Sequence, residues 1–390
     1  MPHTLVLDIG KTHKKCYVFN ESFQILFEQS DSLPQTTDED GHSCEDIRLL
    51  TEWIRGSYTK LCKDYNKTIT HVNCSAYGAS LVFVDDQGKT LTPLYDYHKP
   101  YPKRLEQLWE NQYGDRKIID LQTASPSLGS LNSAMQLFRL KHDRPKLYEK
   151  LHYALHLPQF VTWVLTGKCY NELSSLGCHS RFWDFSKGNY HQWVFQEGFD
   201  LVLPPPRRFI IFPFGDKSFG SGVHDSSAAV LPYLRSFDEP FILLSTGTWN
   251  IALNPFNDGS LTQEDLNADC LYYLTPEGKQ VKAARLLAGP VYDEAMAAKA
   301  SGDQDRHDLL TRKLIEGQVK AIQRVLTPSV KTVFVDGGFA KNIEFLNQLS
   351  VKFPDLDWYI SEIAQATALG TAVLMHPAIS VRNELRIHKI

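Results

Sequence analysis

Residues 4–20 read TLVLDIGKTHKKCYVFN, and this stretch decides the fold that we predict for the chain. Two apolar runs, at residues 4–7 and 15–19, flank the short tip Asp8-Ile9-Gly10-Lys11-Thr12. A third strand-like run follows at residues 23–28. Runs of this length separated by turn residues are typical of β-strands. The start of the chain therefore predicts an antiparallel meander with a glycine-containing tip.

The tip belongs to a set of three glycine-containing turns. Such a turn between two strands can point several backbone N–H groups toward one place, where they bind phosphate oxygens. The three are DIGKT at 8–12, STGT at 245–248 and DGGFAKN at 336–342. A single turn of this kind is more often a plain hairpin whose glycine supplies a positive φ. Three of them, spread through both halves of the chain, favour phosphate binding.

Asp8 ends an apolar strand, where an unpaired carboxylate is costly to desolvate unless it meets a cation. Mg²⁺ keeps several of its waters and takes few carboxylates. Asp8 is therefore a candidate Mg²⁺ anchor, acting through water.

The length of the chain predicts two lobes. A single hydrophobic core usually stops growing at roughly 250 to 300 residues, and this chain has 390. After Pro240 a strand at 241–245, a tip at 246–248 and a strand at 249–253 repeat the strand, tip and strand of the N-terminus. We therefore expect two structurally related lobes, at residues 1–238 and 239–390.

The other predicted elements follow from hydrophobic periodicity and turn residues. Further strands are expected at 70–75, 81–84, 332–335 and 358–361, with a hairpin turn at 85–88. The prolines of LPPPRR at 203–208 exclude regular structure there. Helices are expected at 43–65, 133–141, 151–165, 341–351 and 364–375.

Composition excludes several classes of protein. Hydrophobic residues make up 43% of the chain, enough for a globular core, and no apolar run is long enough to span a membrane. The 41 basic and 45 acidic side chains give a net charge of -4, which argues against nucleic-acid or anionic membrane partners. The seven scattered cysteines favour reduced thiols over a disulfide framework, and we expect a cytoplasmic protein.

Asp225 lies in the run GSGVHDSSAA, directly before a predicted helix. From the local sequence alone, a simple N-cap is the more common role for such a residue. The alternative is a general base that accepts the proton of an attacking sugar hydroxyl, since phosphoryl transfer needs a well-positioned nucleophile more than a strong base. His224 beside it could orient the substrate, although a histidine at a helix start is more often structural.

Other catalytic patterns are weak or missing. His152 and His156 have the spacing of two metal ligands on one helical face, but without a third ligand a core or surface role is favoured. No GxSxG, HExxH or Walker A motif is present, so hydrolase functions that depend on those motifs are not predicted.

Five motifs in order resemble the FGGY family of carbohydrate kinases, and more narrowly its rhamnulokinase branch. The segment NCSAYGASLVFVDDQGKTLTPLYDY at 73–97 also resembles the sugar segment of that branch. The five motifs are DIGKTHKK (8–15), GSGVHDSSAAV (220–230), STGTWN (245–250), VDGGFAKNIEFLNQ (335–348) and EIAQATALG (362–370).

The resemblance implies an α/β protein with the actin-like ATPase fold, in which two ribonuclease-H-like lobes surround a central cleft. Sugar would bind mainly to the N-terminal lobe and ATP to the C-terminal lobe, with Mg²⁺ at Asp8 and Asp225 as the general base. The resemblance implies phosphate or nucleotide contacts for Asp8, Gly10, Lys11, Thr12, Thr246, Gly247, Thr248, Gly337, Gly338 and Asn342. Candidate sugar residues are Tyr77, Gly78, Asp96, His98 and His224.

The chain departs from the pattern of the family in three places. Tyr77-Gly78-Ala79 replaces a tryptophan, a glycine and an acidic residue. Lys11 and Lys14 stand in the first phosphate loop, where they could neutralise phosphate or be solvated. The stretch RLLAGPVY at 285–292 replaces an asparagine-bearing helix start near the adenine site.

The predicted function is phosphorylation of a ketose hydroxyl by ATP, with a deoxyketose such as L-rhamnulose or L-fuculose as the substrate. The alternatives are a catalytically silent sugar or nucleotide sensor of the same fold, and an actin-like or chaperone-type ATPase. The predicted partners are a small sugar and ATP, with a homodimer as one option for assembly.

Overall fold

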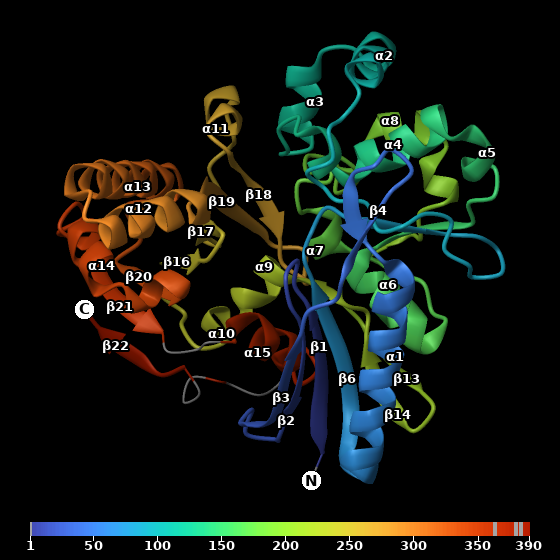
Figure 1. The fold of residues 1–390 in the computed structure, drawn as a ribbon, viewed down its shortest axis with the longest axis horizontal. Coiled ribbons are helices and arrows are strands. Elements are labelled where there is room, and N and C mark those ends of the chain that lie inside the picture. Colours follow the sequence, from blue (N-terminus) through green and yellow to red (C-terminus); the bar gives the residue numbers. More distant parts are fainter. Residues whose placement is uncertain (1, 362–364, 378–380, 382–384) are drawn as a thin grey trace. The chain divides into compact units, whose positions relative to one another are not determined.

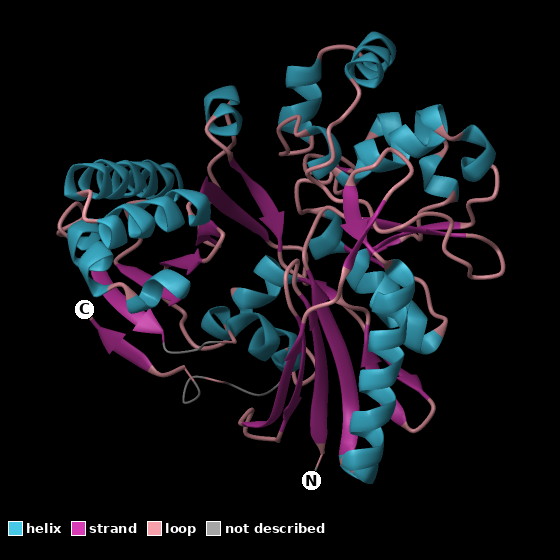
Figure 2. Ribbon diagram, in the orientation of Figure 1, coloured by secondary structure: helices cyan, strands magenta, loops and turns pink. Residues whose placement is uncertain are grey.

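Two mixed β-sheets organise the chain in the computed structural model, which describes residues 2–361, 365–377, 381 and 385–390. Contacts divide the chain into two compact units. The first unit consists of Met1–Ala228, Leu274–Gly278 and Thr367–Ile379, and the second of Ala229–Tyr273, Lys279–Ala366 and Ser380–Ile390. Each unit contains one large sheet (Figures 1 and 2).

The sheet of the first unit has the strand order β13-β14-β6-β1-β2-β3, with β15 also paired to β6. The first three strands form the predicted antiparallel meander, and β6 and β15 run parallel to β1 and β6 respectively. The strands are β1 (His3–Ile9), β2 (Lys14–Phe19), β3 (Ile25–Asp31), β6 (Ile69–Ala76), β13 (Ile211–Phe214), β14 (Lys217–Gly220) and β15 (Val223–His224).

Helices and short strand pairs complete the first unit. Helix α1 runs beside β6, and α6 packs against both (Figure 1). The helices are α1 (Ile47–Asp64), α2 (Lys103–Tyr113), α3 (Arg116–Gln122), α4 (Ser133–Asp143), α5 (Pro145–Tyr148), α6 (Leu157–Thr166), α7 (Leu173–Leu176), α8 (Gln192–Gln196), α9 (Asp225–Ala229) and α15 (Ala366–Val373). The short pairs are β4 (Gln35–Thr37) with β5 (Ser43–Glu45), β7 (Leu81–Val84) with β8 (Tyr153–His156), β9 (Asn171–Glu172) with β12 (Pro206–Arg207), and β10 (Trp183–Asp184) with β11 (Asn189–Tyr190).

The sheet of the second unit has the order β18-β19-β17-β16-β20-β21-β22. Helices α12 and α13 lie side by side, and α13 packs on β17 and β19 (Figure 1). The strands are β16 (Phe241–Thr246), β17 (Trp249–Asn254), β18 (Cys270–Leu274), β19 (Gln280–Leu287), β20 (Thr332–Gly337), β21 (Asp357–Ser361) and β22 (Ile387–Lys389). The helices are α10 (Leu231–Leu234), α11 (Gln263–Asn267), α12 (Gly289–Ser301), α13 (Gln304–Val325) and α14 (Ile343–Ser350).

The two sheets share one topology. Three antiparallel strands, β3-β2-β1 in the first unit and β19-β17-β16 in the second, continue into parallel strands, β6-β15 and β20-β21. This is the arrangement of ribonuclease-H-like units, as predicted. Within the described residues no helix combines the length and apolar character that a membrane span requires.

Two predicted helices are wrong at their N-terminal ends. Residues 43–45 are strand β5, paired with β4, because Asp46 caps α1 by accepting hydrogen bonds from the backbone N–H groups of Arg48 and Leu49. Residues 153–156 are strand β8, paired with β7, and Pro158 stands in the first turn of α6. His152 and His156 therefore do not share a helical face, so their four-residue spacing does not make them a pair of metal ligands.

Two smaller predictions also need revision. Pro206 and Arg207, inside the segment expected to lack regular structure, pair with β9 through the backbone. The helix expected at 364–375 begins at Ala366 in the described part of the chain, and residues 362–364 of the motif EIAQATALG lie outside the described residues.

Candidate active site

Three parallel strands of the first unit bring the candidate residues together. In the strand register, Asp8 of β1 lies opposite Ser75 of β6, and β15 pairs with β6 so that His224 lies opposite Ala76. The next residues along β6 and β15 are Tyr77 and Asp225. Ligands of open α/β sheets bind at the carboxyl ends of parallel strands, and this edge carries Asp8, Tyr77 and Asp225.

Asp8 is a half-buried carboxylate with a second carboxylate nearby. Ser75 Oγ donates a hydrogen bond of 2.9 Å to Asp8 Oδ1. Burial raises the pKa of Asp8 to about 6, the charge of Asp225 adds to this rise, and Ser75 and Lys15 oppose it. A divalent cation would stabilise two neighbouring carboxylates, and oxygen is the donor that Mg²⁺ prefers, so these residues fit a magnesium site.

Lys15 is a site residue that the sequence reasoning missed. It lies directly opposite Asp8 in the antiparallel register of β1 and β2, and its charge lowers the pKa of Asp8. The predicted meander could have indicated this pairing, because the first residues after a hairpin tip lie opposite the last residues before it.

Asp225 is the first residue of α9, and its two carboxylate oxygens differ. Oδ1 accepts hydrogen bonds from the backbone N–H of Ser226 at 2.6 Å and from its hydroxyl at 3.2 Å, and it lies 3.1 Å from His224 Nε2. Oδ2 has no partner among the described residues, and 32% of the side chain is exposed. One oxygen is thus held in place while the other is available to accept a proton.

His224 is buried and joins Asp225 to a cysteine. Its Nε2 lies 3.0 Å from Cys178 Sγ, and its Nδ1 lies 3.1 Å from Ser227 Oγ. Burial lowers the pKa of His224, but Cys178 and Asp225 outweigh burial and raise it to about 10. The raised pKa favours the protonated imidazole of His224, which places a positive charge beside Asp225.

Gly78 packs directly on this group. A Cβ atom at Gly78 would lie 2.5 Å from Cys178 Sγ and 2.9 Å from His224 Nε2, which is closer than real Cβ atoms approach. Only glycine fits here, so the predicted sugar segment and the loop that carries Asp225 meet at residue 78. No motif or spacing in the sequence indicated that Cys178 would contact His224 and Gly78.

The remaining candidate sugar residues lie beside the tip at residues 8–12, the first of the predicted phosphate tips. Asp96 contacts Lys11 Nζ at 3.1 Å and accepts a hydrogen bond from the His98 backbone N–H at 2.8 Å. His98 is largely exposed and contacts Asp96 through Nδ1. Between them, Tyr97 has its pKa raised to about 12, first by burial and then by the charges of Asp96 and Asp225. Tyr97 is therefore near Asp225, and it was not predicted.

The first phosphate tip is held by a buried lysine. Lys14 is 2% exposed, and its Nζ donates to the carbonyl oxygens of Gly10 at 3.0 Å and Lys11 at 3.1 Å. Gly10 N–H donates to the carbonyl of His13, while Thr12 is exposed at the tip. Lys14 is thus not solvated. Its ammonium group binds the backbone carbonyl oxygens of the tip instead of being directed at a phosphate.

The second and third tips pack against each other in the second unit. Thr246 Oγ1 donates to the carbonyl of Asp336 and accepts a hydrogen bond of 3.0 Å from Phe339 N–H. Gly247 N–H donates to Asn250 Oδ1, and Gly289 N–H donates to the carbonyl of Thr248. The predicted residues 246–248 and 337–338 therefore form one structural group.

Asp336 mirrors Asp8. In the second unit the serine, Ser245, lies on β16 and the acid, Asp336, lies opposite it on β20. In the first unit the acid, Asp8, lies on β1 and the serine, Ser75, lies opposite it on β6. Burial raises the pKa of Asp336 to about 7 against the hydrogen bonds of Ser245 and Tyr233. Each unit therefore places one acid and one serine at the same position of its central parallel pair, with Asp336 buried and Asp8 half-buried.

A cavity of about 320 Å³ lies between α12, α13 and the segment that leads into α14. Its size falls within the roughly 300–1,000 Å³ of small-molecule pockets. Gly338 and Asn342 line it, together with Tyr292 from the stretch that departs from the family pattern. Asn342 also caps α14 by accepting a hydrogen bond from Phe345 N–H. Two of the residues predicted to contact the nucleotide, Gly338 and Asn342, thus line this cavity, whereas Gly337 is not among its lining residues.

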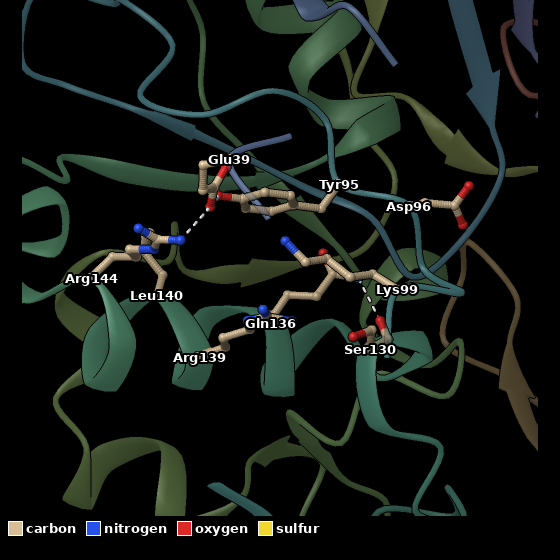
Figure 3. A pocket seen from close by; sticks show the side chains of 9 residues that line it. All are labelled: Glu39, Tyr95, Asp96, Lys99, Ser130, Gln136, Arg139, Leu140 and Arg144. Carbon is tan, nitrogen blue, oxygen red and sulfur yellow. Dashed lines mark hydrogen bonds and ion pairs between the residues drawn. The ribbon is translucent and has the colours of Figure 1, made fainter. Parts of the chain in front are cut away.

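A second, small pocket in the first unit is lined by Lys99, Arg139 and Arg144 (Figure 3), whose charges are all paired. Lys99 binds Asp38 and Asp40, Arg139 binds Asp40, and Arg144 binds Glu39 and Asp40. Asp96 lines the same pocket. Because its cations are already paired, the pocket fixes the loop that carries Asp96 and offers no strong anion site.

Glu172 links the site to a measurable pH dependence of stability. It is fully buried and accepts hydrogen bonds from the N–H and hydroxyl of Ser174, and Ser174 Oγ in turn accepts the backbone N–H of His224. Burial raises the pKa of Glu172 to about 7, although its hydrogen bonds oppose the rise. The folded state therefore binds a proton that the unfolded state has already released between about pH 4.5 and 7.

Glu172→Gln, which imitates the protonated acid, should be more stable than the wild type above pH 7. Each unit of pKa shift is worth about 1.4 kcal/mol, so a gain of about 3–4 kcal/mol is expected at pH 8 and almost none at pH 4.5. Urea unfolding across this range measures it. An equal effect of the substitution at both pH values would contradict the assignment.

Comparisons with known proteins agree with the motifs. The N-terminal domain of the FGGY family of carbohydrate kinases matches residues 3–200, and the C-terminal FGGY carbohydrate kinase domain matches residues 238–331. A rhamnulokinase of Halalkalibacterium halodurans is 23% identical over 286 residues, and an L-fuculokinase of Escherichia coli is 22% identical over 274; each alignment covers 64% of this chain and 56% of the relative. The chain thus spans about half the length of the curated relatives it matches.

Solved structures show the same fold. A carbohydrate kinase from Novosphingobium aromaticivorans has a TM-score of 0.83 at 22% identity, with 100% of this chain and 94% of that chain covered. A xylulose kinase from Lactobacillus acidophilus has a TM-score of 0.79 at 14% identity, with 100% and 93% covered. The predicted actin-like fold is confirmed. With two family domains matched and the fold shared throughout, the chain belongs to the FGGY family of carbohydrate kinases.

Proposed function

We propose that the protein transfers the γ-phosphoryl group of ATP to a hydroxyl of a ketose, most specifically a deoxyketose such as L-rhamnulose or L-fuculose. The observation that carries this proposal is Asp225, whose Oδ1 is held by Ser226 and His224 while its Oδ2 has no partner in the described part of the chain. The rhamnulokinases and L-fuculokinases among the relatives support the choice of sugar. In this proposal residues 1–238 bind sugar, residues 239–390 bind ATP, and the reaction takes place in the cytoplasm.

Asp225 acts as the base in the proposed mechanism. Its Oδ2 accepts the proton of the sugar hydroxyl as that oxygen forms a bond to the γ-phosphorus. The bond from the γ-phosphorus to the bridging oxygen of ADP breaks, and ADP leaves with the electron pair. Because this transition state is loose, positioning and charge stabilisation supply most of the rate.

The phosphate contacts are assigned to the three tips. Backbone amides at 10–12, 246–248 and 337–338 would bind phosphate oxygens, and Asp8 would hold Mg²⁺ through water. Bound Mg²⁺ would neutralise charge on the phosphates. Lys15, opposite Asp8, adds a positive charge at the same place.

A sugar panel tests the proposal against its alternatives. ATP consumption is measured with ketoses, polyols and aldonates, and with no sugar. A kinase consumes ATP only with its sugar, a chaperone-type ATPase consumes it without sugar, and a silent sensor consumes none under any condition. The neighbouring carboxylates Asp8 and Asp225 argue against a sensor, because binding alone needs no base.

Asp8→Ala should raise the Mg²⁺ concentration required for half-maximal activity by roughly ten- to a hundredfold. The substitution removes the carboxylate that would anchor the hydrated cation, and it also removes the repulsion between Asp8 and Asp225. Titration of activity with Mg²⁺ at saturating sugar measures this. An unchanged Mg²⁺ requirement would mean that Asp8 is only structural.

A further inference from the structure

Glu45 is a buried carboxylate beside the first phosphate tip that has no role in the proposed mechanism. It is 6% exposed and ends the short strand β5. Its backbone N–H and carbonyl both bond to Leu94, at 3.1 and 3.2 Å. The main chain at Glu45 is therefore fixed, and its side chain has a defined position.

Both carboxylate oxygens of Glu45 are occupied by residues near the candidate site. Oε2 lies 2.6 Å from Lys14 Nζ. Oε1 accepts a hydrogen bond of 2.7 Å from the Tyr77 hydroxyl and lies 3.5 Å from Lys11 Nζ. We call Lys11, Lys14, Glu45 and Tyr77 the Glu45 cluster. It joins the first phosphate tip to the predicted sugar segment through one side chain.

Lys14 depends on this carboxylate. Its ammonium group is buried, and removing one partner of a buried ion pair leaves a charge that is costly to keep out of water. The same ammonium holds the carbonyl oxygens of Gly10 and Lys11. Carbonyl oxygens repel phosphate oxygens. Because Lys14 holds both carbonyl oxygens by hydrogen bonds, the tip can accept an anion. Glu45 thus controls the tip through Lys14.

Lys11 has a different place in the cluster. Its Nζ lies between Glu45 and Asp96 and faces the rings of Tyr77 and Tyr97, at 5.4 and 5.2 Å from their centres. A cation in contact with aromatic faces and carboxylates is held firmly. The charge of Lys11 is therefore already balanced within the first unit.

We infer that Glu45 is a positioning residue, which sets the first phosphate tip and Tyr77 in one arrangement so that nucleotide and sugar are bound in register. This inference rests on the proposed function. Glu45 lies outside the five family motifs. The sequence predicted a helix from residue 43, whereas Glu45 lies on strand β5.

Glu45→Gln is the test, because it keeps the shape and removes the charge. The expected result is roughly ten- to a hundredfold weaker binding of a non-hydrolysable ATP analogue with Mg²⁺, and a KM for sugar raised by a similar factor. Asp120→Asn is the matched control, since Asp120 is equally buried and binds Arg181 Nη2 at 2.7 Å on helix α3. It should lower stability without changing either affinity.

A double-mutant cycle with Lys14→Met tests the route of the effect. If Glu45 acts through Lys14, the double variant should bind the analogue no more weakly than Lys14→Met alone. Affinities within twofold of the wild type in Glu45→Gln, or equal losses in Asp120→Asn, would overturn the inference. A wild type that binds the analogue but phosphorylates no sugar contradicts the proposed function alone, whereas one that does not bind it contradicts both.

Discussion

Asp225→Asn is expected to lower kcat by roughly two to four powers of ten, which corresponds to about 3–5 kcal/mol of activation free energy. The amide keeps the size of the side chain and can still accept the hydrogen bond from Ser226 N–H. It has no charge with which to accept the proton of the sugar hydroxyl. The loss should therefore appear in kcat, with the KM for ATP changed by no more than a few fold.

The measurement is steady-state turnover with the sugar that the panel identifies, alongside thermal unfolding of the same preparation. Asp216→Asn serves as the control, because that carboxylate is 78% exposed on the first unit and lies outside the proposed mechanism. It should retain full activity. Activity of Asp225→Asn within tenfold of the wild type would contradict the role of Asp225 as base.

Gly337→Ala should destabilise the second unit by about 2–5 kcal/mol and abolish detectable nucleotide binding. Gly337 has φ +82°, where a residue with a Cβ is strained by about 1–2 kcal/mol. A Cβ there would also lie 1.9 Å from the backbone oxygen of Thr246, so the two tips would have to separate. Overpacking of this kind costs about 1–3 kcal/mol more.

Gly338→Ala is the matched control for this prediction, because a Cβ at the next residue would meet nothing within 4 Å. Urea unfolding and ADP binding compare the two variants. Gly338→Ala should unfold like the wild type, and equal destabilisation by both substitutions would show that the packing of Gly337 against Thr246 is not what demands glycine.

Local patterns predicted the tips and most of the strands well. The alternation of apolar residues and turns at 4–28 became β1, β2 and β3, and the repeat after Pro240 became β16 and β17. These elements are decided by short-range periodicity and by glycine, which are visible in a single sequence. The helix expected at 43–65 was wrong only at its N-terminal end, where pairing of residues 43–45 with β4, a tertiary contact, overrode helical periodicity.

The site was predicted in part. Asp8, Gly78 and Asp225 were all named; the strand register brings Asp8 and Asp225 to one edge of a sheet, and Gly78 packs on His224 there. Cys178 and Tyr97 were not named, because their partners lie far along the chain: Cys178 meets His224 46 residues away. No period or motif encodes a contact of that kind, since it depends on how the intervening elements pack.

The sequence by itself determined that the chain has two related α/β units and that glycine-containing tips lie in both, and it singled out Asp8 and Asp225 as the acids to examine. Only the tertiary structure decided what surrounds those acids. The buried pair of Glu45 and Lys14, the imidazole of His224 on Asp225 and the contact between Thr246 and Gly337 all come from strand register and packing. Local propensities act over a few residues, whereas burial and charge pairing are settled when distant segments exclude water together.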